Sequence, residues 1–328
     1  MCLESRLLTR CSLILPSLLA LLLAFGCGGT AQPSSETEGT RTPSDTSAPV
    51  LIATTGMVAD VVQSVVGPHA QVVTLIPAGA DPHLWTPTRT DIVQLLDADA
   101  LFMNGLGLEG RAGEAFARVS NSGRPVCAVT SALTQEDLLR DPSNPHHPDP
   151  HVWMDPLVWG RTALAVAETM TQLDPTHAED FNRNALHYVF EAEKLHDEIK
   201  AMLDQVPTAN RMLTSSHDAF GYFGKRFGFE VRGIQGISTE SEASVGDIER
   251  LVAELCGRSI PTVFIETTVS DRTIRALVDG CAARGHALKI GPALFSDSMG
   301  APGTAGGTWL GMIRHNASSI ASGLRGGA

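Results

Sequence analysis

The sequence predicts an α/β protein of two (βα)4-type lobes with parallel sheets, joined by one long connecting helix. Three observations predict this fold class. Short apolar runs that end in turn residues alternate with helix-favouring stretches, which is typical of buried parallel strands and their crossover helices. The alternation occurs twice along the 328 residues. Between the two series lies a long charged stretch without internal glycine or proline, which favours a single helix.

Residues 1–27 are expected to be an export signal and not part of the fold. Arg6 and Arg10 precede the apolar run Leu13–Phe25, which is shorter than the about 20 residues that a membrane span needs. A basic start, a short apolar centre and a small residue at its end are typical of a secretory signal. The end of the run resembles a bacterial lipobox, so Cys27 is the candidate lipidation site. Conventional cleavage is the alternative.

Residues 28–49 are expected to form a disordered tether. They are mostly Ser, Thr, Pro, Gly and Glu, with almost no large apolar side chain. Such a segment cannot bury enough surface to offset the entropy lost on ordering. A tether that follows an acylated cysteine would leave the folded protein exported, in the periplasm or on the outer cell surface, and anchored to the membrane by lipid.

The N-terminal lobe is expected to span residues 50–173. Apolar runs bounded by turn residues predict its strands at 50–54, 71–76, 100–103 and 125–129. Helical spacing predicts helices at 57–66, 90–96 and 157–173, the last of them after a loop rich in Pro and His.

The connecting helix is expected to span residues 174–206. Asp174-Pro175 is a helix-start signal, and Pro207 ends the stretch. A helix of about 30 residues would be roughly 45 Å long. One lobe does not need that length, so the helix is interpreted as a rigid connector between two lobes.

The C-terminal lobe is expected to span residues 207–328. Its pattern predicts strands at 211–215, 229–234, 262–266 and 287–289, and helices at 219–227, 245–256, 271–284 and 307–322. The two halves share no close sequence repeat, but they show the same alternation of strands and helices.

Charge and cysteine content exclude some classes of function. The net charge is −12, and no basic cluster follows the signal, so nucleic acid is not an expected partner. Beyond Cys27 the chain has only Cys127, Cys256 and Cys281, which are too few and too scattered for a disulfide framework or a thiolate metal site. Cys256 and Cys281 could form one disulfide in an oxidising compartment or remain buried thiols.

Four side chains in loops are candidate metal ligands. His83, His217 and Asp297 each follow a predicted strand, and His151 follows the Pro- and His-rich loop. In open α/β sheets, ligands bind beyond the carboxyl ends of the strands. Three imidazoles and one carboxylate suit Zn²⁺, Mn²⁺ or Fe²⁺. Because each lobe supplies two of them, the ion would lie in the inter-lobe cleft.

Two carboxylates are candidates for supporting these ligands. Ligating imidazoles commonly donate their second N–H group to a carboxylate. Glu266 lies at the end of a predicted strand and is the stronger candidate, and Glu240 is the weaker one.

Six segments carry a resemblance to a known family. They are GADPH (79–83), NGLGLE (104–109), HVWMD (151–155), SHDAFGYF (216–223), FIE (264–266) and FSD (295–297). In this order they resemble the cluster A-I (TroA-like) zinc/manganese solute-binding lipoproteins of ABC importers. The resemblance implies metal ligands at His83, His151, His217 and Asp297, and two lobes joined by a long helix. It also implies a monomeric receptor, not an enzyme, that delivers its metal to an ABC permease and its ATPase.

The resemblance leaves the metal and some alternative functions open. Family members that favour manganese often have Glu at the position of His217, and dedicated zinc members carry a long His-rich loop. This chain has neither feature. An exported zinc-dependent hydrolase would need an open coordination position and a general base. A siderophore or cobalamin receptor of similar architecture would need an open cleft lined by aromatic or Arg side chains, and an adhesin role is untested by sequence.

Overall fold

The computed structural model describes residues 48–141 and 144–325. The predicted signal, with Cys27, and nearly all of the predicted tether lie outside these residues. Within the described part of the chain, no helix is both long enough and apolar enough to cross a membrane.

The N-terminal lobe contains one parallel four-stranded sheet, and all four of its strands were predicted. The strand order is β2-β1-β3-β4. The strands are β1 (Val50–Ala53), β2 (Gln71–Thr74), β3 (Ala100–Met103) and β4 (Val126–Ala128). The helices are α1 (Gly56–Val66), α2 (Arg89–Asp97), α3 (Gly113–Asn121), α4 (Pro156–Trp159) and α5 (Thr162–Leu173).

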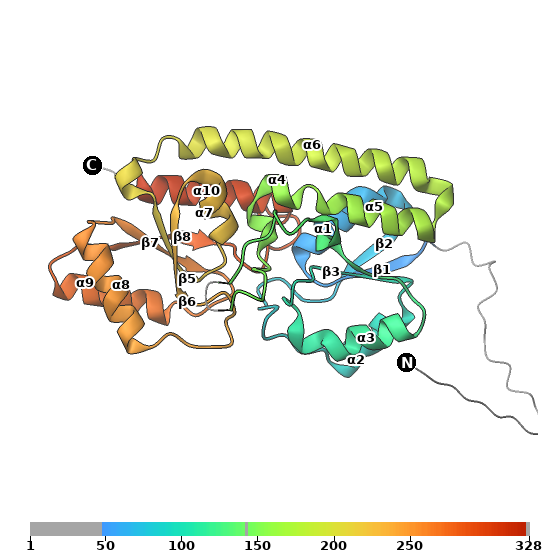
Figure 1. The fold of residues 1–328 in the computed structure, drawn as a ribbon, viewed down its shortest axis with the longest axis horizontal. Coiled ribbons are helices and arrows are strands. Elements are labelled where there is room, and N and C mark those ends of the chain that lie inside the picture. The colour runs from blue at the N-terminus through green and yellow to red at the C-terminus, as the bar shows by residue number, and fades with distance from the viewer. Residues whose placement is uncertain (1–47, 142–143, 326–328) are drawn as a thin grey trace, which may run out of the picture. The chain divides into compact units, whose positions relative to one another are not determined.

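Helices cover both faces of this sheet (Figure 1). Leu51 and Phe102 belong to the apolar cluster that contains α1 and α5, whereas Ile52 and Leu101 belong to the cluster that contains α2 and α3. Side chains alternate between faces along a strand, so a strand buried on both faces has a continuous apolar sequence. This explains why short apolar runs located the central strands β1 and β3 correctly.

Two helix predictions in this lobe were incomplete. Helix α3 was not predicted: it is short, begins at a glycine and buries little more than Ala115, Phe116 and Val119. The single helix predicted at 157–173 is two helices, α4 and α5, separated at Gly160. A Cβ atom at Gly160 would lie 2.8 Å from Cβ of Ala192, so the glycine permits close contact with the connecting helix.

The long connecting helix is α6 (Ala178–Leu203), preceded by a 3-10 turn at Pro175–His177. Its 26 residues span about 39 Å. Seven buried side chains at spacings of three or four residues form its inner face: Phe181, Ala185, Tyr188, Ala192, Leu195, Ile199 and Leu203. This face packs on α1, α4 and α5 of the first lobe and on α10 (Trp309–Leu324) of the second (Figure 1). The prediction of a helix that links two lobes is confirmed.

The C-terminal lobe pairs its strands as two parallel two-stranded ladders, β5-β6 and β7-β8, with β5 beside β7. The strands are β5 (Met212–His217), β6 (Glu230–Gln235), β7 (Thr262–Glu266) and β8 (Lys289–Leu294). The helices besides α10 are α7 (Gly221–Phe227), α8 (Val245–Gly257) and α9 (Arg272–Ala283).

The prediction for the last strand was wrong. It was placed at 287–289, but β8 runs from Lys289 to Leu294 through Gly291 and Pro292. Gly and Pro usually end a strand. Here Gly291 is needed for a close contact, and Pro292 is tolerated. A Cβ atom at Gly291 would lie 2.6 Å from the ring of Phe264, and the pairing with β7 is irregular at this point. Proline is accepted where a strand is not paired on both sides.

The two lobes share a continuous apolar core. One buried cluster extends from β1 and α1 through α6 and α10 to β7 and α9. Trp153 donates its indole N–H to the Ser296 carbonyl at 2.9 Å, and Trp309 donates to the Trp153 carbonyl at 3.0 Å. Because these hydrogen bonds join the two lobes directly, we expect them to limit large hinge motions.

The described cysteines Cys127, Cys256 and Cys281 are free thiols in the structure. Burial, followed by the neighbouring Cys256 thiol, raises the pKa of Cys281 to about 12. The two thiols are therefore neighbours across the packed helices α8 and α9, and a disulfide between them stays a prediction.

Candidate metal centre

The structure brings together the four predicted ligands. His83, His151, His217 and Asp297 each offer one ligand atom, and these atoms all lie within 4.8 Å of one another. His83 comes from the loop after β2, His217 is the last residue of β5, and Asp297 follows β8. His151 precedes a 3-10 turn that leads into α4. The four side chains are buried, with relative exposures between 0 and 7%.

The distances between ligand atoms fit a small divalent cation. Nε2 of His151 lies 3.3 Å from Nε2 of His83 and 3.3 Å from Oδ1 of Asp297, and Nε2 of His217 lies 3.2 Å from Oδ2 of Asp297. Around a tetrahedral Zn²⁺ with bonds of about 2.0–2.1 Å, neighbouring ligand atoms are about 3.3 Å apart. These three separations match that value, and Nε2 of His83 lies somewhat farther, 3.7 Å, from Oδ2 of Asp297.

Three polar atoms at the centre of this group lack hydrogen-bond partners within the described residues. They are Nε2 of His217 and both carboxylate oxygens of Asp297. The imidazole nitrogens lie near these oxygens, but the geometry is not that of hydrogen bonds. Buried polar atoms without partners are rare in native proteins. A cation bound at the centre would satisfy all three.

Two carboxylates orient two of the imidazoles. Oδ1 of Asp149 lies 2.7 Å from Nδ1 of His151, and Oε2 of Glu266 lies 2.5 Å from Nδ1 of His217. A hydrogen bond donated by Nδ1 leaves the lone pair of Nε2 free for a metal. Glu266 lies where the sequence analysis placed it. Glu240 does not contact the imidazoles: its half-exposed carboxylate pairs with Arg111 at 3.0 Å.

Sequence reasoning did not single out Asp149, although a signal was present. The tripeptide Asp-Pro-His occurs twice, at 81–83 and at 149–151. In both copies the Asp side chain accepts the backbone N–H of the His, at 2.9 Å from His83 and 3.0 Å from His151. The repeat therefore marks two equivalent turns, each of which presents a ligand.

A buried glutamate fixes the loop beside His151. Glu109 accepts hydrogen bonds from the Thr54 hydroxyl at 2.7 Å and the Asn104 backbone N–H at 2.8 Å. The Asn104 side chain donates to the Pro150 carbonyl at 3.0 Å. Burial raises the pKa of Glu109. The NGLGLE segment thus holds the backbone of the His151 turn in place.

Electrostatics favour a proton on two imidazoles when no metal is bound. Burial alone would lower the pKa of His151, but Asp149 and Asp297 outweigh it and raise this pKa to about 9. Burial would also lower the pKa of His217, but Asp297 and Glu266 raise it well above its usual value.

The other two candidate ligands, His83 and Asp297, have the charge states that metal binding requires at neutral pH. Burial lowers the pKa of His83 to about 4, so its imidazole is neutral. Burial would raise the pKa of Asp297, but His217 and His151 hold it well below its usual range. A divalent cation that displaces the two imidazolium protons would leave the net charge of the site unchanged.

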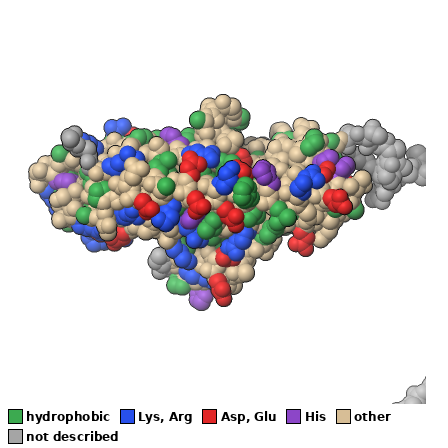
Figure 2. Space-filling model, turned by 90° about the horizontal axis from the view of Figure 1, so that it is seen from above, with side chains coloured by type: hydrophobic (Ala, Val, Ile, Leu, Met, Phe, Trp, Pro, Cys, Tyr) green, Lys and Arg blue, Asp and Glu red, His purple; other side chains and the backbone are tan. Residues whose placement is uncertain are grey.

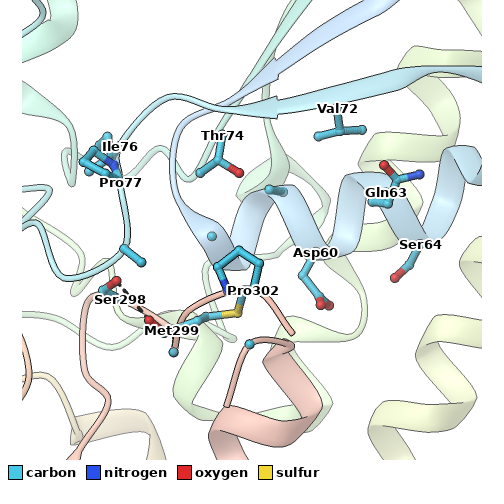
Figure 3. A pocket seen from close by; sticks show the side chains of 15 residues that line it. Asp60, Gln63, Ser64, Val72, Thr74, Ile76, Pro77, Ser298, Met299 and Pro302 are labelled. Carbon is cyan, nitrogen blue, oxygen red and sulfur yellow. Dashed lines mark hydrogen bonds between the residues drawn. The ribbon is translucent and has the colours of Figure 1, made fainter. Parts of the chain in front are cut away.

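Two cavities lie near the site. One of about 520 Å³ is lined by His83 together with Arg111, His147 and Glu240, and by none of the other three ligands. The other, of about 530 Å³, lies between α1, β2 and the loop 298–307 (Figure 3). Asp60 lines this second cavity, but its oxygens already accept hydrogen bonds from the backbone N–H of Trp309 and the hydroxyl of Tyr188. Of the four candidate ligands, His83 is the one that lines the first cavity, so this ligand is the one next to open space there.

Comparisons with known proteins agree with this geometry. Residues 51–323 match the family model described as zinc-uptake complex component A, periplasmic. The chain is 38% identical to the zinc-binding protein TroA of Treponema pallidum over 276 residues, 84% of this chain and 89% of that protein. It is 34% identical to the manganese-binding lipoprotein MntA of Bacillus subtilis over 275 residues, again 84% and 89%. The solved structure of the Treponema pallidum periplasmic zinc-binding protein superposes with a TM-score of 0.81 at 38% identity, covering 85% of this chain and 99% of that one.

Proposed function

Since the chain belongs to the zinc-uptake complex component A family, we propose that it is an extracytoplasmic receptor that captures Zn²⁺ or Mn²⁺ and delivers it to an ABC importer. His83, His151, His217 and Asp297 would bind the ion between the lobes. The observation that carries this proposal is the set of buried atoms, Nε2 of His217 and both oxygens of Asp297, that have no other partner in the described structure.

The geometry argues against a metal-dependent hydrolase. Such an enzyme needs an open coordination position and a free general base beside it. Besides the candidate ligand Asp297, the carboxylates that contact these imidazoles are Asp149 and Glu266, and both are hydrogen-bonded to candidate ligand side chains. A siderophore or cobalamin receptor is also disfavoured, because the four ligands are buried and spaced for a single ion.

The donor set allows either metal. Three neutral imidazoles and one carboxylate oxygen suit tetrahedral Zn²⁺. Both oxygens of Asp297 face the other ligands, so bidentate binding would expand the coordination and accommodate Mn²⁺ or Fe²⁺. On intrinsic affinity Zn²⁺ binds more tightly than Mn²⁺ at such a site. Preference in the cell would then depend on which metal is supplied.

Titration of the metal-stripped protein tests the proposed function. We expect one Zn²⁺ per chain by calorimetry, and displacement of bound Mn²⁺ by Zn²⁺ in competition. Elemental analysis of protein purified without added metal would identify the ion acquired in the cell. Failure to bind any divalent transition metal, or hydrolytic turnover by the loaded protein, would contradict the proposal.

Metal binding should release about two protons per ion at neutral pH, because His151 and His217 carry protons in the free site and must lose them. Protons bound to the free protein compete with the metal, so the apparent affinity should fall as the pH falls from about 9. Calorimetry in buffers of different ionisation enthalpy measures the number released. An observed enthalpy that is independent of the buffer would refute this expectation.

We further propose the placement of the protein in the cell. The signal at 1–27 would be cleaved between Gly26 and Cys27, so that Cys27 becomes the lipid-bearing N-terminus. Residues 28–49 would then tether the lobes at 50–173 and 207–328, which the connector at 174–206 joins. A monomer would dock on the permease, with the ATPase on the opposite side of the membrane.

On the face drawn in Figure 2, Lys and Arg lie among Asp and Glu without a broad basic patch, which is not the pattern of a nucleic-acid-binding surface.

A further inference from the structure

We propose that Thr239 and Ser298 are positioning residues of the metal site, whose hydroxyl groups connect the His83 loop to the opposite lobe and slow release of the ion. This inference rests on the proposed function. Neither Thr239 nor Ser298 belongs to the four candidate ligands. Both would therefore act through the loops that carry His83 and Asp297.

The first connection runs through Asp81. Its Oδ1 accepts the backbone N–H of His83 at 2.9 Å, and its Oδ2 accepts the hydroxyl of Thr239 at 2.6 Å. Thr239 lies in the loop between β6 and α8 of the C-terminal lobe and is 8% exposed. Asp81 therefore couples the backbone of one ligand in the first lobe to a buried hydroxyl of the second.

The second connection runs through Ser298, the residue after Asp297. Its hydroxyl oxygen accepts the backbone N–H of Gly79 at 2.7 Å and donates to the Met299 carbonyl at 3.3 Å. Figure 3 shows Ser298 and Met299 at the edge of the second cavity. Gly79 has φ of 83°, a conformation that favours glycine, so the turn presents its N–H at low cost. The loops of His83 and Asp297 are thereby joined.

The four ligands are held in two different ways. His151 and His217 are oriented by Asp149 and Glu266, which belong to their own lobes. The connections through Thr239 and Ser298 instead join the His83 loop to the opposite lobe. Separation of the lobes would break these two hydrogen bonds while leaving His151 and His217 oriented.

The second cavity leaves room for the Asp297 loop to move. Ile76, Pro77, Met299 and Pro302 line the cavity of about 530 Å³ together with Ser298 (Figure 3), and none of the four candidate ligands lines it. Ser298 and Met299 border this cavity, whereas Ser296 and Asp297 are buried, so a shift of the loop would have room only beyond Asp297. The Ser298 hydrogen bond would restrain that shift together with the bond from the Trp153 indole to the Ser296 carbonyl.

Release kinetics test this inference. The Zn²⁺-loaded full chain is mixed with excess chelator in a stopped-flow instrument. We expect Thr239→Val and Ser298→Ala each to release the ion about tenfold faster, as expected for the loss of a buried hydrogen bond, one of them to a charged group. Association rates should change less, because the substitutions leave His83 and the side chains that line the cavity beside it unaltered. Thr239→Ser keeps the hydroxyl and should release at the wild-type rate.

Matched controls remove hydroxyls that bond within their own helix. They are Thr169→Val, which loses a bond to the Ala165 carbonyl, and Ser322→Ala, which loses one to the Ser319 carbonyl. Both should release at the wild-type rate. Should Thr239→Val fail to fold, the smaller Thr239→Ala serves the same purpose.

The outcomes separate this inference from the proposed function. Wild-type release from both Thr239→Val and Ser298→Ala would overturn the positioning role, and so would equally fast release from Thr239→Ser and Thr239→Val. A wild-type protein that binds no Zn²⁺ would instead overturn the proposed function.

Discussion

Replacing His217 by alanine is expected to weaken Zn²⁺ binding by at least about a hundredfold. A four-ligand zinc site binds with about 10–16 kcal/mol, so one ligand accounts for on the order of 3 kcal/mol. The loss should be large here because Nε2 of His217 is fully buried and has no other hydrogen-bond partner in the described structure. Competitive calorimetry against a chelator of known affinity measures the change.

A second histidine provides the matched control for this prediction. His187 is exposed on α6, so His187→Ala should bind Zn²⁺ as the wild type does. A His217→Ala protein that remains folded and binds with unchanged affinity would remove His217 from the ligand set.

Changing Asp149 to asparagine is expected to weaken Zn²⁺ binding by about 10–100-fold, as for other residues that orient a ligating imidazole. The amide can still accept a hydrogen bond from Nδ1 of His151 but no longer carries the charge. The pKa of His151, which Asp149 and Asp297 raise to about 9, should fall. Metal binding at neutral pH should then release about one proton where the wild type releases about two.

Another aspartate–histidine pair serves as the control for this substitution. Asp174 lies 2.5 Å from Nδ1 of His177, outside the cleft. Asp174→Asn should alter neither Zn²⁺ affinity nor the number of protons released. An Asp149→Asn protein with weaker binding but unchanged proton release would show that Asp149 acts only on the fold of the turn.

Much of the candidate site could be predicted because some of its residues follow strands and all four candidate ligands lie in segments that resemble a known family. A parallel strand buried on both faces has a distinct apolar sequence, and the residues beyond its carboxyl end meet those of its neighbours. His217 and Asp297 follow this rule directly. Glu266 could be predicted for the same reason, since it ends β7 beside β5.

The supporting contacts could not be predicted, because they depend on which loops meet across the cleft. Asp81 and Thr239 are 158 residues apart, and nothing in either local sequence indicates the other. Gly79 and Ser298 are 219 residues apart. Strand β8 was misplaced for a related reason: Gly291 is explained only by the ring of Phe264 on the neighbouring strand.

Anomalous diffraction from crystals of the zinc-loaded protein tests the central claim most directly. We predict one strong peak per chain, within bonding distance of Nε2 of His83, His151 and His217 and of at least one oxygen of Asp297. A strong peak elsewhere, with no density between these four side chains, would contradict the assignment of this cleft as the metal site.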